Sequence, residues 1–367
     1  MKFSMFHIAM GAGRESDQQV YDDFMGDLAL ADELGYDTFW LAEHHFNSDF
    51  SMSPSPNVLL GAAAAVTKNI RIGTSINVLP FHNPVRLAEE GSMLNLLSRG
   101  RFRWGIGRGI TGHEFRSFGV DASNSLEMFR EAHDLIIHAW KTGRLDWAGK
   151  YFNVPDDTHL APAMSQEHFP DVWVTAQSPS SVEWTAQHSY TAMQVAESIE
   201  SGKDQLALYK KSAKDAGVPI SSNGCIAPLR YIYVAETEKE AREKIAPQIT
   251  EWWDSFTHIA APQESNAPKQ HQHSIVDPKS EVTGYEFWND PKTSYKHKNA
   301  GLDFDGLNDA GIIAVGTAEQ VIELLEGQVA DLELEHMLCD FWRAGETKAD
   351  RRKSMRLFGE KVIPYFK

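Results

Sequence analysis

The sequence predicts an α/β fold in which eight parallel strands alternate with helices and close into a barrel, a (β/α)8 or TIM barrel. Short apolar runs alternate about eight times with longer helical patterns along the 367 residues, which favours a closed parallel sheet. Two apolar runs end in groups that can carry chemistry, Glu43-His44-His45-Phe46 and Gly105-Ile106-Gly107-Arg108-Gly109. Active sites of such barrels lie at the C-terminal strand ends. We expect one domain over residues 1–367.

The elements follow from hydrophobic runs and from the residues that begin and end helices. Strands are expected at residues 2–9, 37–42, 70–78, 101–106, 171–175, 191–195, 226–235 and 335–341. Helices are expected at residues 17–34, 57–67, 84–97, 125–141, 180–188, 239–256, 318–330 and 349–362. The first helix begins at Ser16 or Asp17 and stops at Gly35, and the third begins with Pro84, as capping preferences predict.

One late segment, residues 260–307, breaks this alternation. It is polar, rich in Pro, Gln, His, Lys and Asp, and has neither the helical nor the strand period. A stretch of this length inside a compact domain is usually a functional loop or an insertion. A mobile lid and an inert insertion are both consistent with it. His271 and His273 have a metal-like spacing, but no nearby carboxylate pattern supports a metal site, and we expect none.

Composition and charge exclude several classes of function. Lys and Arg number 35 against 51 Asp and Glu, a net charge of −16, which disfavours a general nucleic-acid or anionic-membrane surface. Any bound phosphate therefore needs a local basic pocket. The two cysteines, Cys225 and Cys339, indicate no disulfide framework and a reducing compartment. With no signal peptide and no membrane-spanning run in the sequence, a cytoplasmic protein is expected.

The first strand-end motif contains two adjacent histidines. Side chains of neighbouring residues on a strand point to opposite faces, so His44 and His45 cannot easily hold one metal together. One is expected to face the barrel mouth and the other to pack among helices. A histidine at the mouth can act as a general base near neutral pH. A hydrogen-bonded structural histidine is the alternative.

Two segments could bind an anion. Three glycines around Arg108 allow a ligand to approach the backbone, and the guanidinium suits a phosphate. The second segment, Gln177-Ser178-Pro179-Ser180-Ser181, follows a strand and opens a helix, where free N–H groups and hydroxyls favour phosphate. A tight turn with a solvated arginine and simple helix capping explain the same residues. Both segments follow strands, so they could converge on one phosphate.

Many short motifs, in the same order and nearly end to end, give the sequence a family resemblance. They are Met1-Lys2-Phe3, Glu43-His44-His45-Phe46, Leu79-Pro80, Pro84-Val85-Arg86, Gly100-Arg101-Phe102-Arg103, Arg108-Gly109, Glu183-Trp184, Gly284-Tyr285-Glu286-Phe287, Ser354-Met355-Arg356-Leu357-Phe358 and Pro364-Tyr365. Together they resemble the bacterial luciferase family of flavin-dependent monooxygenases, and within it the catalytic alpha subunit.

The resemblance implies a barrel that binds reduced FMN supplied by a separate flavin reductase. The family uses O2 through a C4a-peroxyflavin to oxidise its substrate, here expected to be a small apolar aldehyde, ketone, alkane or terpene-like compound. It also implies dimers, with either an identical or a different partner. By the same resemblance His44 is the catalytic histidine, and Ser75-Ile76 is a position where the family often has a non-prolyl cis peptide. Three positions match its phosphate site: Arg108, Ser178 and Ser181.

Two departures from the family pattern concern the expected flavin site. Gly107 stands where light-emitting alpha subunits have a reactive cysteine, which removes a side chain and would enlarge the substrate pocket. Gln177 stands where the family has a glutamate beside the phosphate. Flavin binding is still expected, whereas light emission is not. The apolar pocket is expected to be lined by residues at strand ends, with core packing as the alternative for each: Phe6, Trp104, Trp173 and Met193.

Two other functions fit the same resemblance. One is an F420-dependent oxidoreductase of the same superfamily, which transfers hydride without O2. The other is a non-catalytic flavin-binding subunit. The closeness to the alpha subunit argues against the first. The retained His44 and the long segment at 260–307 argue against the second.

Overall fold

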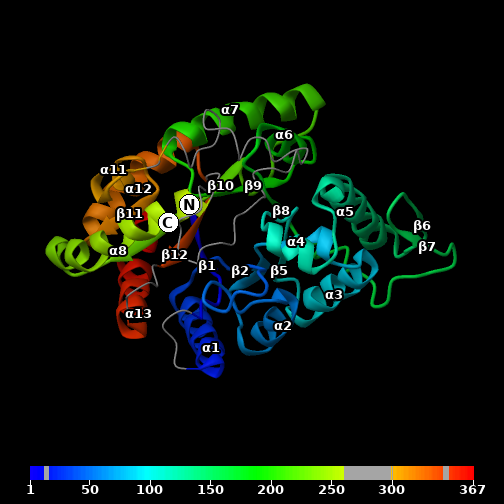
Figure 1. The fold of residues 1–367 in the computed structure, drawn as a ribbon, viewed down its shortest axis with the longest axis horizontal. Coiled ribbons are helices and arrows are strands. Elements are labelled where there is room, and N and C mark those ends of the chain that lie inside the picture. Colours follow the sequence, from blue (N-terminus) through cyan, green and yellow to red (C-terminus); the bar gives the residue numbers. More distant parts are fainter. Residues whose placement is uncertain (12–15, 260–298, 300, 342–346) are drawn as a thin grey trace.

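A closed ring of eight parallel strands forms the centre of the protein (Figure 1). The structure, a computed structural model, describes residues 1–11, 16–259, 299, 301–341 and 347–367. In order around the ring the strands are β1 (Lys2–His7), β2 (Thr38–Leu41), β3 (Arg71–Thr74), β5 (Phe102–Gly107), β8 (Val172–Thr175), β9 (Thr191–Val195), β10 (Ile226–Val234) and β12 (His336–Phe341). Pairing of Lys2 with His336 closes the ring between β1 and β12, which confirms the predicted barrel.

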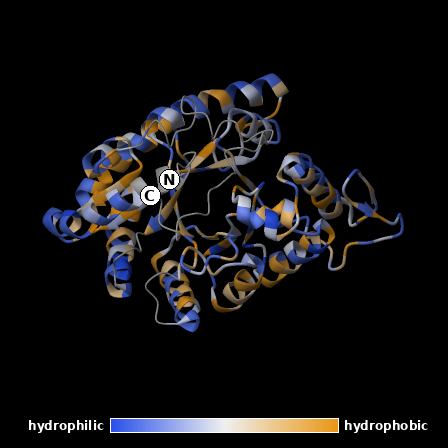
Figure 2. Cartoon of the chain, viewed as in Figure 1, coloured by the Kyte–Doolittle hydropathy of each residue, from blue (hydrophilic) through white to orange (hydrophobic). Residues whose placement is uncertain are grey.

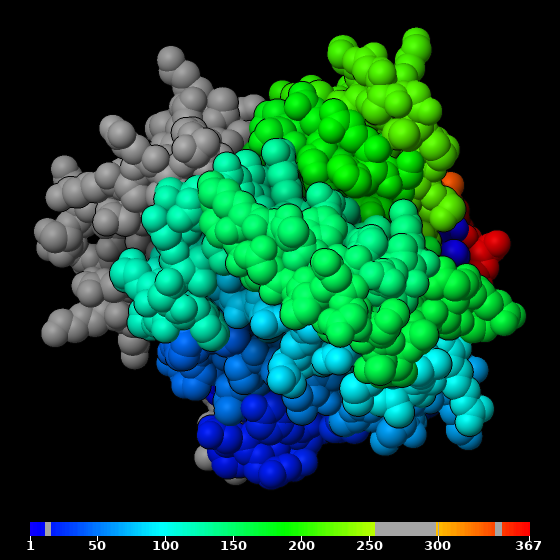
Figure 3. Space-filling model, turned by 90° about the vertical axis from the view of Figure 1, so that its right-hand side faces the viewer, coloured from blue at the N-terminus to red at the C-terminus, as the bar shows by residue number. Residues whose placement is uncertain are grey.

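Four short strands supplement the ring. β4 (Asn77–Val78) follows β3 and pairs with β5. β11 (Ile313–Gly316), which the sequence pattern did not indicate, pairs with β10 beyond the part that pairs with β9. It therefore extends the sheet without entering the ring. β6 (Trp147–Ala148) and β7 (Asn153–Val154) form an antiparallel hairpin, which projects at the right of Figure 1 and faces the viewer in Figure 3.

Helices surround the ring and connect its strands. Their bounds are α1 (Asp17–Leu34), α2 (Pro56–Val66), α3 (Pro84–Leu97), α4 (Gly112–Ser117), α5 (Ser125–Thr142), α6 (Pro179–Gln187), α7 (Ile199–Ala216), α8 (Glu238–Ile259), α11 (Phe304–Asp309), α12 (Ala318–Leu332) and α13 (Lys348–Leu357). Ser16 caps α1 by accepting the N–H of Gln19, and Gly35 ends it with φ of 76°, a left-handed conformation that suits glycine. No helix among the described residues is long and apolar enough to cross a bilayer.

The structure corrects two expectations about the helices. The sequence pattern missed α7, whose buried face is narrow and includes Leu206, Tyr209 and Ala213. The polar segment expected over residues 260–307 falls mostly outside the described residues, but its end is helical, because α11 begins at Phe304. Asp303 caps this helix by accepting the N–H of Gly306. A helix of six residues shows too few apolar repeats for the helical period to be recognised.

The apolar core has an outer layer and an inner one. Outward-facing strand residues pack on the helices, which carry both hydrophobic and hydrophilic residues (Figure 2). Trp104 of β5, for example, contacts the ring of Trp140 on α5 with centroids 4.6 Å apart. Trp40 and Trp173 lie on strands that are not neighbours, yet their rings are 5.0 Å apart. They therefore meet across the barrel interior.

A charged cluster at the N-terminal ends of the strands fills the base of the barrel. The Arg103 guanidinium donates to Asp37 at 2.5 Å and to Asn223 at 3.1 Å, and it lies 5.3 Å from the ring centre of Trp173. Burial and the charge of Arg103 lower the pKa of His336 to about 3, so this histidine is neutral. The base is filled by structural contacts, and the opposite end remains for a ligand.

Candidate active site

The expected site residues follow four strands at the C-terminal end of the barrel. His44 follows β2, Ser75 and Ile76 follow β3, Arg108 follows β5, and Gln177 follows β8. These strands are successive neighbours in the ring. Because parallel strands end at one edge, the barrel brings these segments together.

His44 is held by a buried carboxylate that the sequence did not reveal. Its Nδ1 lies 3.2 Å from Oε1 of Glu114 on α4, and the same oxygen accepts the backbone N–H of His45 at 2.8 Å. The side chain of Glu114 is 3% exposed and that of His44 is 23% exposed. A proton on Nδ1 satisfies Glu114 and leaves Nε2 of His44 as an acceptor. This arrangement suits a residue that moves a proton.

His45 has a different role. Its Nε2 lies 3.2 Å from Oε1 of Glu43, its side chain is buried, and its ring lies 4.6 Å from that of Phe118. The sequence predicted that one histidine faces the barrel mouth and that the other packs among helices; in the structure His44 is partly exposed and His45 is buried.

The chain after β3 leaves its register to make a surface beside β5. The peptide between Ser75 and Ile76 is cis, as the resemblance implied. At this point the Thr74 side chain bonds to the backbone of β5. Its hydroxyl donates to the carbonyl of Gly105 at 2.7 Å and accepts the N–H of Gly105 at 3.0 Å. A Cβ on Gly105 would lie 1.9 Å from the carbonyl oxygen of Thr74. Glycine is therefore required where these backbones meet.

The absence of a side chain at Gly107 does not enlarge the pocket as expected. A Cβ there would lie 2.0 Å from Cδ1 of Ile76. The isoleucine side chain thus occupies the space that a side chain at position 107 would take. Ile76 is partly exposed and packs against the inner apolar layer, so it is an apolar surface at the mouth.

The candidate anion site combines Arg108 with the start of α6. Ile106 pairs with Val174, so Arg108 and Ser178 each follow paired residues of neighbouring strands. Ser178 caps α6 by accepting the N–H of Ser181 at 3.3 Å, and the Ser181 hydroxyl donates to the carbonyl of Ser178 at 2.7 Å. Gln177 is turned away, since its Nε2 donates to the carbonyl of Val195 at 2.5 Å. Capping explains the serines, and the hydroxyls and the helix start also suit a phosphate.

The four expected pocket residues lie in three different places. Phe6 is partly exposed beside the inner layer, and Met193 lies at the mouth, with its Sδ 3.5 Å from the Ser75 hydroxyl. Trp173 lies deeper, between Trp40 and the base cluster. The expectation for Trp104 was wrong, because alternation along β5 turns it outward onto α5.

Most of the chain matches a known protein family. Residues 1–336 match the model of the family described as luciferase-like monooxygenase. The chain belongs to this family.

Relatives of this luciferase-like monooxygenase cover it from end to end. The alkanal monooxygenase alpha chain of the Kryptophanaron alfredi symbiont is 27% identical over 375 residues, covering 100% of this chain and 99% of the relative. The crystal structure of monooxygenase RslO1 from Streptomyces bottropensis has a TM-score of 0.80 at 24% identity, with full coverage of both chains. The oxygenating constituent of 3,6-diketocamphane monooxygenase from Pseudomonas putida, solved with FMN, has a TM-score of 0.78 at 22% identity, covering 99% and 98%.

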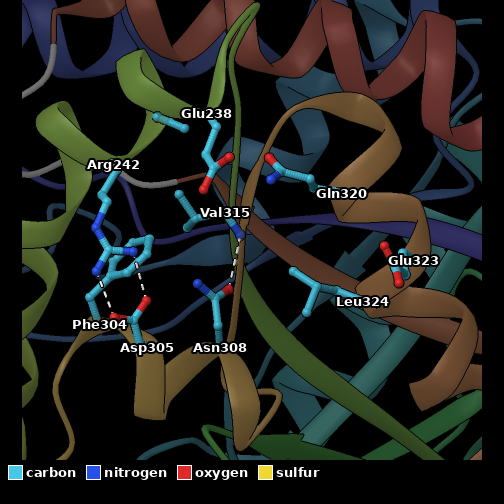
Figure 4. A pocket seen from close by; sticks show the side chains of 10 residues that line it. Glu238, Arg242, Phe304, Asp305, Asn308, Val315, Gln320, Glu323 and Leu324 are labelled. Carbon is cyan, nitrogen blue, oxygen red and sulfur yellow. Dashed lines mark hydrogen bonds and ion pairs between the residues drawn. The ribbon is translucent and has the colours of Figure 1, made fainter.

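A hollow lies outside the barrel mouth (Figure 4). It has a volume of about 300 Å³, lies between α8, α11, β11 and α12, and is lined by Glu238, Arg242, Asp305 and Glu323 among others. Arg242 is already bound to both oxygens of Asp305 at 2.7 and 2.6 Å. The remaining carboxylates disfavour a phosphate there. No predicted site residue lines it.

Some site residues were not predicted from the sequence, and some predicted residues lie outside the part of the chain that the structure describes. Glu114 and His82 contact the histidine motif because the fold brings them there, and no local sequence pattern indicates these contacts. His271, His273 and the Gly284-Tyr285-Glu286-Phe287 segment fall outside the described residues. Within the described part of the chain, no group of three or more His, Cys, Asp or Glu could hold a metal.

Proposed function

We propose that this chain is the oxygenase component of a two-component monooxygenase that uses reduced FMN and O2 to oxidise a small apolar compound. The observation that carries the proposal is the His44–Glu114 pair at 3.2 Å, located at the same strand ends as an apolar surface and an anion-binding segment. Family membership supports flavin chemistry. The FMN bound to the diketocamphane oxygenating constituent supports the choice of cofactor.

The residues present at the mouth fit FMN. The flat ring would lie against the Ser75-Ile76 segment, whose two side chains are partly exposed at the mouth. Arg108, Ser178 and Ser181 would hold the phosphate, and Gln177 adds no negative charge there. Bound reduced flavin supplies the activation of O2 for transfer of one oxygen atom to the substrate.

The chain's own residues bind the substrate, exclude water and move a proton. Phe6, Ile76 and Val195 are partly exposed and pack on the inner layer, so they offer an apolar surface for an aldehyde, ketone, alkane or terpene-like compound. Glu114 fixes the His44 ring, and Nε2 of His44 accepts or returns the proton at the reacting centre. A separate flavin reductase would supply the reduced cofactor.

The direct test mixes the protein anaerobically with photoreduced FMN, adds O2 and follows flavin absorbance. Flavin reoxidation at least about tenfold slower than in free solution, and faster again with an apolar substrate, is expected because the site must keep reacting groups from water. Reoxidation as fast as that of free flavin would contradict the proposal and direct attention to reduced F420 or to a non-catalytic subunit.

Arg108→Gln is expected to weaken binding of reduced FMN about 10- to 100-fold, because charged hydrogen bonds to phosphate are strong. Riboflavin lacks the phosphate and is the matched ligand, so its affinity should change by less than about twofold. Anaerobic titration of both flavins measures the difference. An equal loss for the two flavins would show that Arg108 supports the fold and does not bind phosphate.

We also propose that the chain pairs with a second copy of itself through α2 and α3. These adjacent helices expose apolar side chains that form one stripe on each: Val58, Val66, Met93, Leu96 and Leu97. An exposed apolar patch of this kind marks an interface. Leu97→Glu is expected to convert dimers into monomers in light scattering, whereas Ile220→Glu, at an exposed residue outside α2 and α3, should not. A monomeric wild-type chain would instead favour a different partner subunit.

A further inference from the structure

Glu43 is a buried carboxylate at the site, and it takes no part in the proposed chemistry. Its side chain is fully buried, and both of its oxygens are hydrogen-bonded. Oε1 lies 2.8 Å from Nε2 of His82 and 3.2 Å from Nε2 of His45. Oε2 accepts the backbone N–H of Val78 at 3.2 Å and lies 3.5 Å from Nδ2 of Asn77.

The position of β4 explains why a carboxylate is needed there. β2 and β3 pair as far as Leu41 and Thr74. After the cis peptide, β4 pairs with β5 as β3 does, with Val78 facing Gly107. The Val78 N–H is directed to Glu43, and a buried N–H without an acceptor would be costly. Glu43 therefore replaces a missing strand along this edge of β4.

His45 and His82 together keep Glu43 ionised. Burial alone would raise the pKa of Glu43, but the hydrogen bonds from His45 and His82 outweigh it and lower the pKa to about 2. Burial lowers the pKa of His82, whereas the hydrogen bond and charge of Glu43, with a further contribution from Glu90, raise it overall. The charged groups that act on His82 are thus Glu43 on the β2 side and Glu90 on α3.

The same network continues into the helices behind the site. Asn77 donates to Oδ1 of Asn57 at 3.3 Å, and Asn57 donates to Glu90 at 2.8 Å. Asn77 directly follows Ile76, so the network holds the segment that forms the apolar surface at the mouth. The network thus connects the segment after β2 with β4, α2 and α3.

We propose that Glu43 and His82 are positioning residues, whose ion pair fixes β4 and thereby the Ser75-Ile76 surface on which a flavin ring lies. The part that concerns flavin rests on the proposed function. The consequence is a pH dependence. Because the pKa of folded His82 is raised, the ion pair is complete below the ordinary histidine pKa of about 6.5 and weakens as the pH rises through the raised value.

The first test needs no flavin and measures hydrogen exchange of the peptide that contains Val78. His82→Gln keeps a donor but removes the charge, and Glu43→Gln removes the charge of the acceptor. Each is expected to speed exchange of this peptide by at least about tenfold, with other strand peptides unchanged. Unchanged exchange in His82→Gln, which leaves the buried carboxylate in place, would overturn the proposal even if Glu43→Gln fails to fold.

The second test follows FMN affinity from about pH 6 to pH 9, the range in which a histidine titrates. Wild-type protein should lose affinity about three- to tenfold as the pH rises, and His82→Lys, which stays charged, should bind with a flat profile. His168→Gln is the control, because His168 is 53% exposed and should leave the wild-type profile unchanged. A sloping profile in His82→Lys would overturn the positioning role. Wild-type protein that binds no FMN would contradict the proposed function, and the exchange result would still decide the role of the pair.

Discussion

His44→Ala is expected to lower substrate turnover by about 10²- to 10⁴-fold, the usual contribution of a general acid or base. Reduced-FMN affinity should stay within about twofold, because the ring and phosphate contacts come from other strand ends. The reason lies in the geometry of the pair. Nδ1 of His44 is engaged by Glu114 at 3.2 Å, so Nε2 is the ring nitrogen that is left to exchange a proton.

Two matched variants separate proton transfer from packing. Glu114→Gln keeps an acceptor but loses the charge, so turnover should fall less than in His44→Ala, by about tenfold. Phe50→Leu changes a ring whose centroid lies 4.8 Å from that of His44 and should leave turnover within about twofold. Single-turnover rates with substrate, measured beside flavin affinity, give both quantities. Unchanged turnover in His44→Ala would remove His44 from the mechanism.

Asp27→Asn is expected to lower the free energy of unfolding by about 3–5 kcal/mol, because it leaves buried cations without their counter-charge. The Asp27 side chain is fully buried. It accepts from Arg351 at 2.5 Å and from Arg352 at 2.7 Å, and Nε2 of His7 lies 3.5 Å from it. These contacts join α1 to β1 and to α13, whose arginines lie more than 300 positions from Asp27, and so hold the two ends of the chain on one side of the barrel.

The pH dependence of this contribution has a definite sign. Burial acts to raise the pKa of Asp27, but the hydrogen bond from His7 and the charge of Arg351 outweigh it and hold the pKa well below its usual range. The stabilisation is therefore fully present above the unfolded pKa of about 4 and is lost as the pH falls towards the folded value.

Chemical denaturation of wild type and Asp27→Asn at neutral and acidic pH measures this contribution, and the difference between the two proteins should shrink in acid. Asp215→Asn is the control, since its pair with Lys211 lies on the surface and the change should leave the free energy of unfolding nearly unchanged. A difference below about 1 kcal/mol at neutral pH would show that the buried contacts are not coupled to folding.

The order of the eight ring strands and of most helices could be predicted from the sequence, because most of these elements carry a local signal. Short apolar runs gave the eight ring strands, and Ser16, Gly35 and Pro84 gave helix boundaries. The strand-end motifs also followed, since in a parallel barrel every strand ends at the same edge. Elements with weak local signals were missed, namely the polar α7, the one-turn α4 and β11.

The contacts that shape the site were decided only by the tertiary structure. His44 and Glu114 are 70 positions apart in the sequence, and Glu43 and His82 are 39 apart. The Ile76 side chain lies against Gly107 of β5. The direction of Trp104 likewise depends on which face of β5 lies inside the closed ring. The periodicity of hydrophobic residues indicates only local secondary structure. Ring closure, the departure of β4 from β3 and the position of α4 set these distances, because they arise from packing between segments far apart in sequence.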